Sequence, residues 1–247
     1  MRLKTQAVLG LVAAGSLLLA ACSSGSSTSS STTSAAATSA AASGSAAASS
    51  AAGSGAATAT TGKIGVILPD TKSSARWETQ DRPNLEAAFK KAGVEFDIQN
   101  ANGDKAAMAT IADGMIAGGV TVLAIVNLDS ESGAAIEKKA KAQGVQTIDY
   151  DRLTLGGSAD YYVSFNNTTV GELQGQGLVD CLGDGNWNIV YLNGSPSDSN
   201  ATAFSAGAHS VTDPLTNLTV VAEQAVPDWD NQQAGTIYEQ MFTAQGG

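Results

Sequence analysis

Five polar stretches of the sequence contain the side chains that could do chemistry, and they share a composition of Asp, Asn, Arg and Trp. The stretches are residues 70–77 (DTKSSARW), 127–129 (NLD), 149–152 (DYDR), 193–200 (NGSPSDSN) and 227–230 (PDWD). Carboxylates accept hydrogen bonds, a guanidinium donates them from a planar fork, and Asn does both. A Trp ring adds an apolar face. This mixture suits a neutral ligand with many hydroxyl groups, such as a sugar ring.

Two carboxylates in the third stretch raise the alternative of an enzyme. Asp149 and Asp151 are two residues apart at the end of a predicted strand, so they would share one face of it. Paired carboxylates of this kind could hydrolyse a glycoside. We favour the other interpretation, in which one Asp holds the neighbouring Arg152 or meets a sugar hydroxyl. The sequence also contains no GxSxG, Walker or GxGxxG motif. We therefore expect no enzymatic activity.

Charge and the scarcity of metal-binding residues exclude other classes of function. The chain has a formal net charge of -10 and no basic cluster, so we expect no nucleic-acid partner. His209 is its one histidine, and no Cys/His spacing typical of a metal site occurs. We predict no metal and no cofactor. Cys181 falls in an apolar helical pattern and is expected in the core.

The elements that must position the polar stretches alternate between strand and helix from residue 63 onward. Hydrophobic patterns predict strands at 63–69, 94–99, 120–126, 145–151 and 160–165, and helices at 78–92, 104–117 and 130–143. This order, with short turns closed by Gly, predicts an α/β fold with a parallel, doubly wound sheet. Ligands of such sheets bind at the carboxyl ends of the strands, where the polar stretches lie.

The same rhythm restarts after residues 165–167, which we place at a boundary between two lobes. The first lobe spans 62–165 and the second 166–247. In the second lobe we predict helices at 168–182, 200–211 and 231–243, and strands at 188–194 and 218–224. A helix that ends in Gly-Gly is normally followed by another strand. The second lobe therefore looks partial, and we expect a fragment or a truncated gene product.

The first 22 residues have the order of an export signal. Basic Arg2 and Lys4 precede an apolar run at 7–21, which is too short and too rich in small residues for a comfortable membrane span. Leu-Ala-Ala at 19–21 and Cys22 resemble a bacterial lipobox, although an ordinary signal peptide with a chance Cys is the alternative. Residues 23–61 are mostly Ser, Ala, Thr and Gly, which is typical of a disordered tether. We predict an exported protein, anchored by lipid on Cys22 to the outer face of the bacterial cell membrane.

Several segments resemble the periplasmic xylose-binding and multiple-monosaccharide-binding proteins of ABC importers. They are KIGVILPDTKSSARWETQDR, NANG at 100–103, TIDYDRL, YYVSFNNTTVGELQG and NGSPSDSNA. The likeness runs from about residue 63 to residue 229. It implies a two-lobed periplasmic-binding-protein type 1 fold that closes on one monosaccharide, xylose or a related aldose. It also implies an ABC transporter permease as partner, with sugar-sensing for signalling or chemotaxis as the alternative role.

The resemblance also implies which residues contact the sugar. Direct contacts are expected from Arg76, Asp151, Arg152 and Asn200, with Asp198 as a further candidate, and a stacking ring from Trp77 or Trp229. The family's remaining contacts come from strands that follow the matched segments. A sugar-responsive transcription regulator shares this core, but here a signal and a tether take the place of the DNA-binding helices.

Overall fold

The computed structural model describes residues 62–246. The predicted signal segment, the lipobox Cys22 and the tether at 23–61 lie outside the described residues, as does Gly247. The described part contains two parallel sheets. We call the larger sheet with its helices the first lobe, and the smaller sheet with its helices the second lobe.

The first lobe is built on a five-stranded sheet with the order β2-β1-β3-β4-β5, in which every pairing is parallel. Its strands are β1 (Lys63–Leu68), β2 (Glu95–Asn100), β3 (Val120–Ile125), β4 (Gln146–Tyr150) and β5 (Tyr161–Val163). The predicted parallel, doubly wound sheet is confirmed. The strand order reverses at β1, which lies between β2 and β3, and ligands bind at such a switch point.

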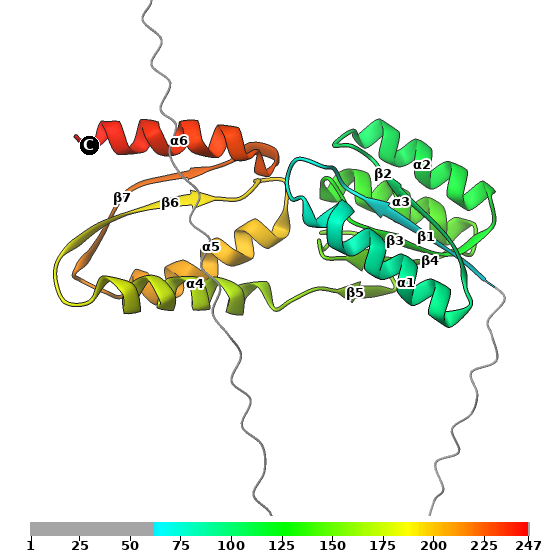
Figure 1. Ribbon diagram of the computed structural model, residues 1–247, viewed down its shortest axis with the longest axis horizontal. Helices are drawn as coiled ribbons and strands as arrows, with labels where there is room; N and C mark the ends of the chain where they lie inside the picture. Colours follow the sequence, from blue (N-terminus) through cyan, green and yellow to red (C-terminus); the bar gives the residue numbers. More distant parts are fainter. Residues whose placement is uncertain (1–61, 247) are drawn as a thin grey trace, which may run out of the picture. The chain divides into compact units, whose positions relative to one another are not determined.

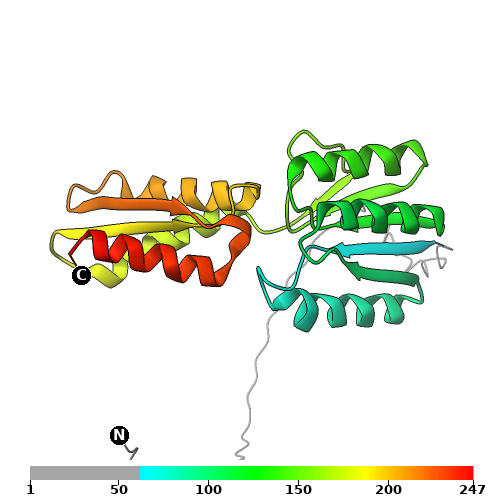
Figure 2. The same cartoon turned by 90° about the horizontal axis from the view of Figure 1, so that it is seen from above.

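Helices cover both faces of this sheet (Figure 2). They are α1 (Arg82–Ala92), α2 (Lys105–Ala117) and α3 (Ser130–Ala142). On one face, Met108 of α2 and Ile136 of α3 pack with the buried residues of β1 and β3. On the other face, Leu85 and Phe89 of α1 pack with Val66 and the indole of Trp77. The apolar runs of β1 and β3 follow from this burial on two sides.

The second lobe repeats the pattern with fewer strands. Its elements are α4 (Asn167–Leu182), β6 (Trp187–Asn193), α5 (Ser199–Thr212), β7 (Leu218–Ala225) and α6 (Asn231–Ala244). The strands β6 and β7 pair in parallel and form a two-stranded sheet. Figure 1 shows α6 on one face of this sheet and α4 with α5 on the other. Ile237 and Met241 of α6 form a small core with Val226.

Glycines allow α4 and α5 to approach closely. A Cβ atom on Gly171 would lie 2.1 Å from the carbonyl oxygen of Phe204, and one on Gly207 would lie 2.1 Å from that of Thr168. Gly175 of α4 is buried on the same side. The expectation that Cys181 is buried was wrong: it is exposed. It lies six residues after Gly175, and this spacing takes it off the buried stripe of the helix.

Four aspartates, three of them from the polar stretches, begin a helix. Asp104, Asp129, Asp198 and Asp230 each accept hydrogen bonds from backbone N–H groups in the first turn of α2, α3, α5 and α6. Such caps satisfy donors that the helix leaves unpaired. Between residues 62 and 246, no helix combines the length and hydropathy needed to cross a membrane.

Candidate functional site

One pocket of about 400 Å³ gathers the residues that the sequence singled out for sugar contact. The seven predicted residues all line it: Arg76, Trp77, Asp151, Arg152, Asp198, Asn200 and Trp229. They come from the segment after β1, the loop after β4, the start of α5 and the turn after β7. The carboxyl ends of strands from both sheets therefore supply the pocket, as the fold predicts.

Arg76 is held by two carboxylates. Its Nε donates to Asp81 Oδ2 at 3.0 Å, and its Nη2 donates to Asp151 Oδ2 at 2.5 Å. Asp81 belongs to η1 (Trp77–Asp81), the single helical turn before α1, and its other oxygen accepts the hydroxyl of Tyr150 at 2.5 Å. A guanidinium with two fixed acceptors has little freedom left, so Arg76 faces the pocket in one orientation.

Asp151 has the backbone conformation that takes it out of the strand. Its φ of 68° is in the left-handed region, and β4 has already ended at Tyr150. Burial raises the pKa of Asp151, the contacts with Arg76 lower it, and the net direction is upward. Asp149 lies elsewhere, because it is buried and accepts hydrogen bonds from Thr154. The expected shared face of Asp149 and Asp151 was therefore wrong, and the hydrolase alternative loses its geometric basis.

Arg152 forms a buried ion pair with Asp198. The Nε atom lies 2.9 Å from Asp198 Oδ2, and the two side chains are 7% and 4% exposed. The Nε–H is not aimed at a hydrogen-bond acceptor, whereas Nη1 donates to the carbonyl oxygen of Asn127 at 3.1 Å. Of the two roles expected for an Asp at the strand end, holding the neighbouring Arg152 is wrong, since the partner of Arg152 comes from the second lobe, and contact with a sugar hydroxyl stays a prediction. Asp198 also accepts the Trp229 indole N–H at 3.0 Å.

Asn200 connects this ion pair to Asp151 through hydrogen bonds. Its Nδ2 donates to the backbone oxygen of Asp151 at 3.0 Å and to Oδ1 at 3.2 Å. Its Oδ1 accepts from Asn167 Nδ2 at 2.8 Å. Asn167 is buried, lines the same pocket, and was missed as a site residue. In the sequence, the pair Asn166-Asn167 at the start of α4 could have pointed to it, but we interpreted this pair only as part of the boundary between the lobes.

The two tryptophans differ in what they offer to a ligand. Trp77 is 3% exposed, its N–H donates to Ser73 Oγ at 3.1 Å, and the Arg76 guanidinium carbon lies 4.1 Å from its ring centre. One face of that ring is therefore covered. Trp229 is half-buried, has a φ of 55°, and meets Phe204 edge-on at 6.4 Å. Of the two predicted stacking rings, Trp229 is the better placed.

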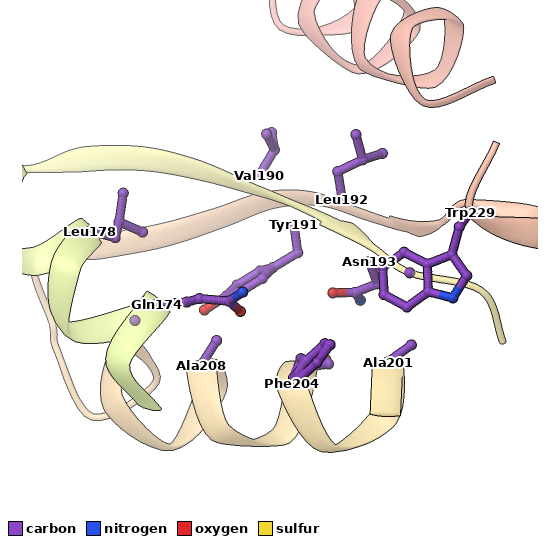
Figure 3. A pocket seen from close by; sticks show the side chains of 13 residues that line it. Gln174, Leu178, Val190, Tyr191, Leu192, Asn193, Ala201, Phe204, Ala208 and Trp229 are labelled. Carbon is purple, nitrogen blue, oxygen red and sulfur yellow. The ribbon is translucent and has the colours of Figure 1, made fainter. Parts of the chain in front are cut away.

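A second pocket of about 250 Å³ lies between β6 and the helices α4 and α5. Figure 3 shows Tyr191 and Asn193 turned toward α5, while Val190 and Leu192 point to the opposite face of the strand. Phe204 and Trp229 line both this pocket and the larger one. The two pockets therefore adjoin at these two rings.

The larger pocket has the chemistry of a binding site for a neutral, hydroxyl-rich molecule. Its charged members are two arginines and two aspartates, so the charges balance. Hydroxyls of Ser73 and Ser74 and the amides of Asn167 and Asn200 add neutral donors and acceptors. Within residues 62–246, no group of three or more His, Cys, Asp or Glu side chains is arranged to hold a metal ion.

The sequence matches known families over most of the described region. The model of the periplasmic binding protein domain matches residues 64–247. The D-xylose-binding periplasmic protein of Escherichia coli is 34% identical over 191 residues, which cover 76% of this chain and 57% of that protein. The multiple sugar-binding periplasmic protein of Azospirillum brasilense is 36% identical over 195 residues, which cover 73% of this chain and 54% of that protein. The chain thus spans about half the length of the curated relatives it matches.

Solved structures agree with the fold. A carbohydrate transporter solute binding protein from Chloroflexus aurantiacus, in complex with D-glucose, is 30% identical with a TM-score of 0.67, over 74% of this chain and 62% of that one. An ABC transporter solute binding protein from Clostridium phytofermentans with bound β-D-glucose is 32% identical with a TM-score of 0.59, over 64% of this chain and 51% of that one. The family model covers well over half of the sequence. The chain therefore belongs to the periplasmic binding protein domain family.

Proposed function

We propose that this protein is the substrate-binding lipoprotein of a sugar ABC transporter and captures a monosaccharide, xylose or a related aldose, for delivery to the permease. The observation that carries the proposal is the pocket of about 400 Å³ that seven predicted contact residues line. Its balanced charge favours a neutral ligand. The similarity to a D-xylose-binding and a multiple sugar-binding periplasmic protein supports the same class of ligand.

Each group of residues has a separate role in this proposal. The guanidinium groups of Arg76 and Arg152 donate to sugar hydroxyls, Asp151 and Asp198 accept from them, and Asn200 does both. Trp229 stacks on the C–H face of the ring. The ion pairs Arg76–Asp151 and Arg152–Asp198 hold these polar groups in place at the pocket. A bound sugar exchanges hydrogen bonds with them rather than filling an empty polar cavity.

Calorimetry tests the ligand. The full chain is titrated with D-xylose, D-glucose and L-arabinose, with a neutral non-sugar polyol as control. We expect saturable heat with at least one aldose and none with the control. The same protein incubated with a nitrophenyl xyloside should release no nitrophenol, since a transport protein leaves its ligand unchanged. The absence of binding heat with all three aldoses would contradict the proposal, and release of nitrophenol would favour an enzyme.

We also propose the lipid anchor on Cys22, which rests on the order of basic, apolar and small residues before it. Acyl chains on one residue hold a protein at a bilayer surface without a spanning helix. Mass spectrometry of the protein from the membrane fraction should give a mature chain that begins at acylated Cys22. The Cys22→Ser variant should lose the acyl mass and leave the membrane fraction. An unmodified N-terminus at another residue would refute the anchor.

A further inference from the structure

Two carboxyl groups are buried together beside the loop that carries Asp151 and Arg152. Glu137 of α3 is 0% exposed and Asp149 of β4 is 1% exposed. Their side chains lie within hydrogen-bonding reach of each other. None of the ion pairs among the described residues includes either of them. Neither carboxylate takes part in the pocket described above.

Two buried carboxylates in contact cannot both keep a negative charge at low cost. One proton on the pair removes the repulsion and supplies an O–H donor. The structure contains the matching acceptor position: Glu137 Oε1 is fully buried and has no hydrogen-bond partner. A proton between the two groups would satisfy this atom. Burial raises the pKa of Asp149, the hydrogen bonds from Thr154 lower it, the Glu137 carboxyl raises it, and the result is about 6.

The charged side chains on the surrounding elements do not neutralise the pair. On α3, Lys138 and Lys139 are exposed, and Lys139 pairs with Asp113 of α2. At the end of β4, Asp151 pairs with Arg76. In the loop, Arg152 pairs with Asp198. Before β5, exposed Asp160 accepts the backbone N–H of Thr147.

The pair holds the loop at residues 151–158 through backbone hydrogen bonds. Asp149 Oδ2 accepts the N–H of Thr154 at 2.6 Å, and Oδ1 accepts its hydroxyl at 2.7 Å. Glu137 Oε2 accepts the N–H of Ser158. Between these two anchors, a Cβ atom on Gly157 would lie 2.5 Å from Glu137 Oε2, so the loop backbone lies directly against the carboxyl group.

Hydrogen bonds through Asn127 connect Thr154 to Arg152. The Thr154 hydroxyl accepts Asn127 Nδ2 at 2.8 Å, and that amide also donates to the backbone oxygen of Arg152 at 3.2 Å. The Asn127 backbone oxygen in turn accepts Arg152 Nη1 at 3.1 Å. A shift of Thr154 would therefore move both the backbone and the side chain of Arg152.

We propose that Glu137 and Asp149 are positioning residues that share one proton, and that loss of this proton loosens the loop at 151–158 and weakens sugar binding. This inference rests on the proposed function of the pocket. Because the affinity for sugar and the affinity for the proton are linked, sugar binding should tighten as pH falls through the pKa of Asp149. The change is about tenfold for each unit by which bound sugar raises that pKa.

The experiment uses the full chain, with D-xylose and D-glucose as probes. Sugar affinity is measured by calorimetry between pH 5 and pH 8, and urea unfolding without sugar is measured between pH 4 and pH 8. In Glu137→Gln an amide replaces the protonated carboxyl and can donate to Asp149 at every pH. We expect wild-type affinity to fall as pH rises through about 6, and the affinity of Glu137→Gln to stay level over that range. Glu131→Gln removes an exposed acid of the same helix and should keep the wild-type profile.

The unfolding series separates this inference from the proposed function. The pKa of Asp149 in the folded protein is raised from 3.8 to about 6, so the free energy of unfolding of the wild type should fall, relative to that of Glu137→Gln, as pH rises across that window. This difference between the two proteins should appear whether or not any sugar binds. If Glu137→Gln does not fold, Asp149→Asn is used in its place. Parallel unfolding series for the wild type and the amide variant between pH 4 and 6 would overturn the shared proton. A shared proton without pH-dependent sugar binding would overturn the positioning role.

Discussion

The ion pair between Arg152 and Asp198 joins the loop after β4 to the first turn of α5. Arg152 Nε and Asp198 Oδ2 are 2.9 Å apart, and both side chains are almost fully buried. The same oxygen accepts the indole N–H of Trp229 at 3.0 Å. One carboxylate therefore positions a cation of the first lobe and a ring of the second, so its charge affects both stability and the shape of the pocket.

Asp198→Asn should destabilise the protein more than the loss of any exposed ion pair. The amide keeps an oxygen for the helix cap but leaves the Arg152 cation buried without a counter-charge, which typically costs about 3–5 kcal/mol. Urea unfolding at neutral pH measures the change. The control is Lys139→Gln, which removes the exposed pair with Asp113 and should change the free energy of unfolding by less than about 1 kcal/mol. Equal effects for the two variants would contradict the importance of the buried pair.

Arg152→Lys should weaken sugar binding while the protein still folds. Lysine keeps the positive charge but cannot reproduce the planar guanidinium, which places Nε beside Asp198 while Nη1 donates to the Asn127 carbonyl. We expect a loss of about 1–3 kcal/mol in the binding free energy, the range of a hydrogen bond to a charged group. Calorimetry with the sugar that the wild type binds measures it. Wild-type affinity in a folded Arg152→Lys variant would restrict Arg152 to a structural role.

Gly194→Ala should displace the Trp229 ring. A Cβ atom at this position would lie 1.9 Å from the nearest atom of the ring, and the neighbouring ring atoms are nearly as close. We expect lost or strongly reduced sugar binding, together with a cost of about 1–3 kcal/mol from overpacking. Tryptophan fluorescence with and without sugar reports the ring position.

The matched control for this change is Gly235→Ala in α6. A Cβ atom there meets nothing within 4 Å, and the position is helical and exposed. Alanine should be neutral or should stabilise the helix by up to about 1 kcal/mol. If Gly194→Ala bound sugar as tightly as Gly235→Ala, the contact between Gly194 and Trp229 would have no part in binding.

The order of elements could be predicted from the sequence because burial determines the hydrophobic pattern. The runs at 63–69 and 120–126 became β1 and β3, which helices cover on both faces. Local pattern was less informative where tertiary packing decides exposure. Cys181 fits an apolar helix, but the contact between α4 and α5 selects the glycine face instead.

Seven of the residues that line the pocket were predicted, but Asn167 and the pairings between side chains were not. Loops after parallel strands meet at one edge, so the polar stretches had to be neighbours. Which Asp meets which Arg depends on backbone turns that no spacing rule contains. The left-handed conformation of Asp151 separates it from Asp149, and Arg152 finds its partner 46 positions further along, at Asp198. The burial of Glu137 against Asp149 could not be predicted, because helix and strand meet only in the folded chain.

His209 should titrate above its ordinary range. Burial lowers its pKa, and hydrogen bonds with Asp213 at 2.8 Å and Glu223 at 3.2 Å raise it, with a net shift upward from 6.5. The stability that these contacts provide should be present below pH 6.5 and lost as pH rises through the raised value. The chain has one histidine, so its single imidazole C2–H signal in an untagged sample gives the pKa directly by NMR. A value at or below 6.5 would contradict the two contacts.

Hydrogen exchange should show that the second lobe opens more easily than the first. In the first lobe, β1 and β3 each pair on both sides, and helices cover both faces of the sheet. In the second lobe, β6 and β7 pair only with each other, and their core contains few fully buried side chains. Opening free energies follow such differences in buried contacts, and a two-stranded sheet is a weak unit.

We therefore expect the amides of β6 and β7 to exchange on the order of tenfold faster, or more, than those of β1 and β3. The edge strand β2 provides the control within the same molecule, because it too pairs on one side only but belongs to the larger sheet. If lobe stability is the cause, β2 is protected better than β7. If edge position alone is the cause, the two strands exchange alike. Protection of β6 equal to that of β1 would mean that the two-stranded lobe is as stable as the five-stranded one, contrary to the difference in their cores.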